Sequence, residues 1–108
     1  MFKFLTNKDR NTSVEYLNLI TDDYKIFLQF LKAKYPMFHN SNFFFRDLQF
    51  GIVKYLENKG TKIRFDDAEV LANKVGKFLE DNGIFIKVNK NAWKLNYPEF
   101  VIPVSVKS

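Results

Sequence analysis

Apolar residues recur at intervals of three and four along the first third of the chain, which is the spacing of one face of an α-helix. The pattern predicts helix over residues 13–35, ended by Pro36. Residues 21–23, Thr-Asp-Asp, are typical of a helix start. The segment is therefore either one long helix or a short helix followed by a longer one. Its predicted buried face consists of Leu17, Ile20, Tyr24, Phe27, Leu28, Leu31 and Tyr35.

Two more helical stripes follow. The first comes after residues 40–42, which are of the type that caps helices, and ends before Gly60. The second begins at Asp66, which has the capping-box spacing to Glu69, and ends at Gly83. Their predicted buried faces are Phe45, Leu48, Ile52, Tyr55 and Leu56, and then Ala68, Leu71, Val75, Phe78 and Leu79.

Beyond Gly83 the hydrophobic period changes to two. Residues 84–88 and 92–97 alternate, residues 89–91 are turn formers, and Pro98 ends the pattern. This predicts a β-hairpin. The expected fold class is therefore α+β and mainly α, with three helices followed by a C-terminal hairpin.

The chain has 108 residues, which is the size of one domain, and 46% of them are hydrophobic, which is enough for a core. We expect residues 1–12 to be a basic N-terminal arm and residues 13–108 to be a single domain. Within the domain, residues 101–106 are either a short edge strand or a tail packed over the core. No apolar run is long enough to cross a membrane, and we expect a cytoplasmic protein without membrane contact.

Candidate catalytic chemistry is scarce in this sequence. There is no cysteine and only one histidine, so thiolate zinc sites and His-based metal clusters are excluded. His39 has no nucleophile or carboxylate at a recognisable spacing, and the four glycines are isolated rather than gathered in a phosphate loop. We therefore expect no enzyme, no cofactor, no bound metal and no small-molecule substrate.

The junction between the third helix and the hairpin carries a family resemblance. Residues 79–84, Leu-Glu-Asp-Asn-Gly-Ile, resemble the same junction in the winged-helix superfamily, whose layout is three helices followed by a hairpin called the wing. For DNA-binding members, the resemblance implies a third helix in the major groove and a wing on the phosphate backbone. Residues 50–88, and particularly residues 66–72, are similar to the DEP-like branch, whose members bind proteins or dock on membranes.

The charge pattern favours the DNA-binding branch as the first interpretation. The net charge is +5, and lysine outnumbers arginine 14 to 3, which suits contact with phosphates better than reading of bases. We expect a transcription or replication accessory factor that contacts double-stranded DNA through charge neutralisation. Trp93 either stacks on a base or packs on the core. The predicted contact residues are Lys87, Lys90, Lys94 and Trp93 on the wing, with Asn73, Lys74 and Lys77 on the third helix.

Two features favour a protein partner instead. Asp66 and Asp67 open the third helix, where their charges would repel phosphate. A helix can hide only one or two of three consecutive rings, so part of the run that includes Phe43 and Phe44 is expected to be exposed. These four residues are the candidate protein-binding set. The partner would be another protein, as for a DEP-like adaptor or a phage or mobile-element inhibitor, or a second copy in a homodimer.

Overall fold

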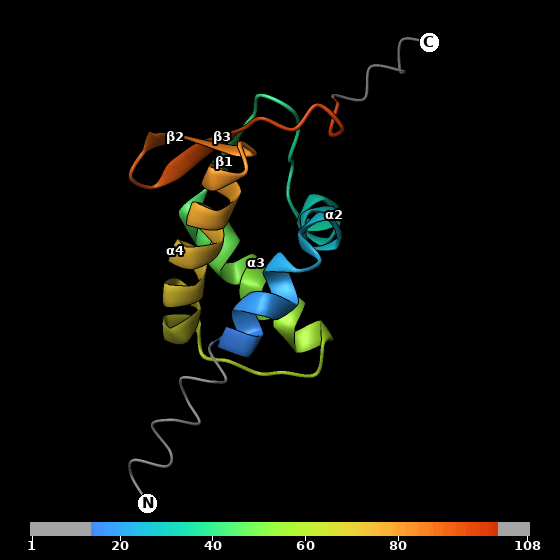
Figure 1. Ribbon diagram of the computed structural model, residues 1–108, viewed down its shortest axis with the longest axis vertical. Coiled ribbons are helices and arrows are strands. Elements are labelled where there is room, and N and C mark those ends of the chain that lie inside the picture. The colour runs from blue at the N-terminus through green and yellow to red at the C-terminus, as the bar shows by residue number, and fades with distance from the viewer. Residues whose placement is uncertain (1–13, 102–108) are drawn as a thin grey trace, which may run out of the picture.

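The computed structural model describes residues 14–101. They form four helices and one three-stranded antiparallel sheet, so the predicted fold class, α+β and mainly α, is confirmed. The sheet lies at one end of the helices, with α4 running up to it (Figure 1). The predicted N-terminal arm, and all of the predicted 101–106 segment except Val101, lie outside the described residues.

The first helical region is divided in two. Residues 14–21 form one helix, Asp22 and Asp23 form a turn, and α2 spans Tyr24–Lys34. The interpretation with a short helix followed by a longer one is therefore correct. The predicted apolar face is buried or half-buried along its whole length.

The strand β1, Asn42–Phe44, was not predicted. It replaces the expected helix start, and α3 begins only at the third ring of the Phe run and spans Phe45–Asn58. The reason is non-local, because β1 pairs with a strand some 50 residues further along the chain. Phe43 lies opposite Trp93 in that pairing.

Helix α4 spans Phe65–Asp81, and it begins one residue before the predicted cap. Arg64 occupies the N-cap and makes no side-chain capping bond, so the predicted capping box of Asp66 and Glu69 is wrong. The Gln49 side chain on α3 donates a 2.9 Å hydrogen bond to the carbonyl of Phe65. This contact ties the start of α4 to the middle of α3.

The two long helices end in the same way. Gly60 and Gly83 both have positive φ, at 87° and 73°. After α4, the Ile84 amide donates to the carbonyl of Leu79 at 2.9 Å, which is the bond of a Schellman cap. Leu79 and Ile84 are both buried at that cap. The predicted helix stop at Gly83 is confirmed.

The predicted hairpin is also confirmed. Its strands are β2, Phe85–Asn89, and β3, Ala92–Leu95. Strand β3 lies in the centre of the sheet, between β1 and β2, and the β2–β3 register shifts at a bulge between Lys87 and Asn89. Both β1 and β2 are edge strands.

One core joins the helices to the sheet. The predicted stripes of α3 and α4 face inward, and one face of the sheet closes the core at its end. The sheet contributes Phe43, Phe85, Trp93 and Leu95 to this core. Because the same strands also have a second face, the alternation of side chains along them decides which residues remain available for binding.

Candidate interaction surfaces on the sheet and helix α4

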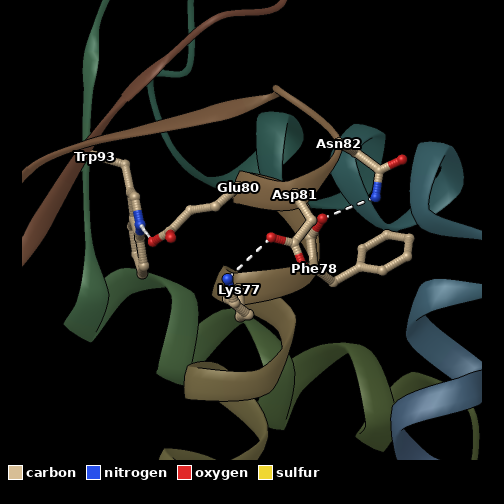
Figure 2. Close-up of polar contacts among 6 residues, drawn as sticks. All are labelled: Lys77, Phe78, Glu80, Asp81, Asn82 and Trp93. Carbon is tan, nitrogen blue, oxygen red and sulfur yellow. Dashed lines mark hydrogen bonds and ion pairs between the residues drawn. The ribbon is translucent and has the colours of Figure 1, made fainter.

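Trp93 is a core residue. Its side chain is 2% exposed, and its indole N–H donates a 2.7 Å hydrogen bond to Glu80 Oε2 on α4 (Figure 2). The ring also lies beside Phe85, with 4.8 Å between centroids. The predicted role of Trp93 in stacking on nucleic acid is therefore wrong, because both its face and its polar atom are already used inside the protein.

A glycine makes room for this ring. A Cβ built on Gly76 would stand 2.6 Å from Cζ2 of Trp93, closer than two carbon atoms approach without displacement. Gly76 is helical, so the absence of a side chain serves close packing of α4 on the sheet rather than an unusual backbone angle. The hairpin is thus held firmly against α4.

The three lysines of the hairpin, Lys87, Lys90 and Lys94, do not share one face of the sheet. Lys87 pairs with Trp93 on the inner side of the sheet, and its ammonium lies 5.1 Å from the centroid of an indole ring. Lys94 is half-buried and pairs with Ile86 on the opposite side, while Lys90 lies in the turn. The hairpin therefore spreads the predicted phosphate contacts over two faces and a tip.

The exposed surface of α4 carries more acid than base. Its sequence contains five carboxylates, Asp66, Asp67, Glu69, Glu80 and Asp81, against the two lysines Lys74 and Lys77. All of these residues except Glu80 are exposed. The surface that would face a DNA groove in the predicted arrangement therefore has a net negative charge.

Two of the predicted DNA contacts on α4 are engaged within the helix. Lys77 Nζ lies 3.0 Å from Asp81 Oδ1, and this hydrogen bond raises the pKa of Lys77 (Figure 2). The Asn73 side chain donates to the carbonyl of Glu69 at 3.1 Å. Lys74 is exposed and takes part in none of the ion pairs found within residues 14–101.

The protein-binding candidates are divided by the structure. Asp66 and Asp67 are exposed in the first turn of α4, where carboxylates stabilise the helix end. The Arg64 guanidinium nitrogen Nη2 lies 3.4 Å from Asp66 Oδ2. Phe44 is 52% exposed. Phe43 is 2% exposed and packs against Tyr35 and Phe85, so its predicted role in partner binding is wrong.

The sheet has an exposed apolar face that the sequence reasoning missed. We call it the outer sheet face and define it by Phe44, Ile86 and Lys94, together with the exposed Val88 at the bulge that follows Ile86 on β2. Ile86 is 44% and Val88 49% exposed, although the aromatic residues on the inner side, Phe43, Phe85 and Trp93, are buried. The signal was present in the alternation of residues 84–88, but the sequence alone did not show which alternate set faces the core.

His39 has a structural role. Its Nδ1 accepts a 3.0 Å hydrogen bond from the Tyr97 amide, and its own amide donates to the carbonyl of Phe100. These bonds fasten the segment after β3 to the connection before β1. Among residues 14–101, no three His, Cys, Asp or Glu side chains gather in a cluster suited to a metal ion.

Comparisons with protein-family models, with curated proteins and with solved structures give no match. Over the part of the chain that the structure describes, no helix has the length and apolar character needed to span a membrane. The functional interpretation therefore depends on the surfaces themselves.

Proposed function

We propose that this chain is a winged-helix module that binds another protein rather than nucleic acid. The order of its elements supports the winged-helix part of the proposal, because α3 and α4 are followed through Gly83 by the hairpin. In this interpretation α4 is the third helix of the module and the hairpin is the wing. The fold leaves the type of partner open, so the choice of partner rests on surface chemistry.

The charge of α4 favours a protein partner over nucleic acid. A third helix in the major groove approaches two phosphate strands, and its exposed carboxylates would meet their negative potential. Four exposed carboxylates against two exposed lysines, one of which is held by Asp81, make that approach unfavourable. Burial of Trp93 further removes the one indole of the chain from any contact with bases.

Fluorescence anisotropy with a labelled 20-base-pair duplex in 50 mM salt tests the proposal. We expect no saturable binding at micromolar protein concentrations. Saturable binding that weakens with salt at a log–log slope of about −3, as for three neutralised phosphates, would overturn the proposal. Capture from native extract, with and without nuclease, supplies the positive arm, because a protein partner should be retained after nuclease treatment.

A second candidate function has its own supporting observation. Lys87 and Lys90 are exposed, and neither they nor Lys94 belong to an ion pair within the described part of the chain. A wing with such lysines could contact the phosphate backbone of duplex DNA without help from α4. This would be sequence-independent binding.

Replacement of the three wing lysines by glutamate separates the two candidates. If the wing binds DNA, the triple variant should lose all duplex binding that the wild type shows in 50 mM salt, with an unchanged far-UV circular dichroism spectrum. The matched control is Lys74→Glu, which reverses one exposed charge on α4. An equal loss of duplex binding in the Lys74→Glu control would mean that binding depends on the overall positive charge of the protein rather than on the wing.

A further inference from the structure

The outer sheet face crosses all three strands. Ile86, Lys94 and Asn42 lie side by side in register on β2, β3 and β1. Phe44 comes two residues after Asn42 and therefore points to the same side, while Val88 lies at the bulge of β2. The result is an exposed apolar surface with a lysine in its middle.

This face has features of a binding surface rather than of an ordinary solvated one. Outward positions on a half-exposed antiparallel sheet are usually polar, but here Phe44 and Ile86 are large, apolar and 52% and 44% exposed beside Asn42 and Lys94. Lys94 is half-buried among them. A lysine that lies beside apolar side chains favours a partner whose carboxylate approaches from outside.

The charges around the face favour a negatively charged partner. Lys94 lies in the face and Lys90 at the adjoining turn. Glu99 is the one acidic residue in the stretch from 84 to 101, and the nearest strand residues, from 85 to 95, include none. Lys87 is not part of this surface, because it lies over the indole on the inner side.

We propose that the outer sheet face binds an acidic amphipathic helix of a partner protein, an inference that rests on the proposed function above. Three strands spaced about 4.8 Å apart present a width of roughly 10 Å, which matches the diameter of one α-helix. The apolar stripe of that helix lies on Phe44, Ile86 and Val88. Its flanking carboxylates meet Lys94 and Lys90.

A pair of synthetic helices tests the chemistry. Both have the same apolar stripe of leucines and a fluorescent label, but one carries glutamates beside the stripe and the other carries lysines. Anisotropy with the full chain should show binding of the Glu-flanked helix that is at least tenfold tighter than that of the Lys-flanked helix. Equal binding of the two, or binding of neither, would overturn the proposal.

Surface variants locate the site. Ile86→Glu should weaken binding of the Glu-flanked helix at least tenfold, because the substitution adds a carboxylate to the apolar face. Lys94→Glu should weaken binding of the Glu-flanked helix and tighten binding of the Lys-flanked helix. The matched controls are Val70→Glu and Lys74→Glu on α4, where Val70 is 57% exposed, and both should bind as the wild type does. Equal weakening by the control variants would overturn the assignment to the sheet.

Other occupants of the face give distinct results. A dimer seen in sedimentation that dissociates on Ile86→Glu would assign the face to a second copy and overturn the proposal. Competition between duplex DNA and the Glu-flanked helix for Lys94 would overturn it together with the proposed function. If the chain retains a nuclease-resistant protein partner that Ile86→Glu does not weaken, only the surface is wrong and the proposed function stands.

Discussion

The two faces of the small sheet differ in how completely they are used. On the inner face, Trp93 is packed against Gly76 and hydrogen-bonded to Glu80, and the neighbouring rings are buried. On the outer face, Phe44 and Ile86 are about half exposed. The same strands supply both faces, so the difference arises from the alternation of side chains. It teaches that the aromatic residues Phe43, Phe85 and Trp93 serve the fold on the inner side, while large apolar side chains on the outer side are left exposed.

The largest expected effect comes from removing the indole of the inner face. Trp93→Ala should destabilise the protein by about 3–5 kcal/mol, because it empties a buried site and leaves Glu80 without its donor. Urea unfolding followed by circular dichroism measures this. A decrease in the free energy of unfolding of less than about 1 kcal/mol would mean that Trp93 does not anchor the hairpin to α4.

A smaller effect is expected where α4 approaches the ring. Gly76→Ala should gain about 1 kcal/mol of helix propensity and lose about 1–3 kcal/mol to overpacking against Trp93, for a net loss of up to about 2 kcal/mol. Because Trp93 is the sole tryptophan of the chain, its emission reports the displacement directly. Lys74→Ala, on the exposed side of α4, is the control and should leave the emission unchanged.

Alkaline pH should weaken the fold through two tyrosines near the sheet. Burial raises the pKa of Tyr35, with a further contribution from the Asp47 carboxylate, and burial followed by a hydrogen bond to Glu99 raises the pKa of Tyr97. A raised pKa in the folded state means that stability is fully present below pH 10, near the unfolded pKa of tyrosine, and is lost as pH rises through the folded values.

Urea unfolding between pH 8 and pH 11 measures this decline. Replacing both tyrosines by phenylalanine should flatten it relative to the wild type. An equally steep decline in the double variant would show that other groups are responsible.

The smallest effect on stability is expected on the outer sheet face. Ile86→Thr keeps a β-branched side chain on β2 at an exposed position outside the core, so the free energy of unfolding should change by no more than about 0.5 kcal/mol. The same urea titration checks this. A loss comparable to that of Gly76→Ala would show that the outer face supports the fold, and would remove the contrast between the two faces.

The local elements could be predicted from the sequence because their signals are local. The stripes of α3 and α4, the stop at Gly83 and the hairpin all follow from the spacing of residues close together in the chain. Strand β1 has only three residues, and its partner is a distant strand. No periodicity can appear over so short a segment, so its pairing had to be seen in three dimensions.

The candidate site was harder to predict because it depends on which side of the sheet meets the helices. The sequence marked Trp93 and the wing lysines as one basic and aromatic cluster, but the pairing places Lys87 and Lys94 on opposite sides. The burial of Trp93 depends on the space left by Gly76, which lies 17 positions earlier in the chain. Such a fit between two elements carries no signal in composition or spacing.

Chemical-shift mapping of the ¹⁵N-labelled full chain with the Glu-flanked helix tests the central claim most directly. The account predicts that the perturbed amides gather at Phe44, Ile86, Val88 and Lys94, while the first two turns of α4 stay unchanged. Perturbations centred on residues 66–77 of α4, or equal perturbations by the Lys-flanked helix, would contradict it.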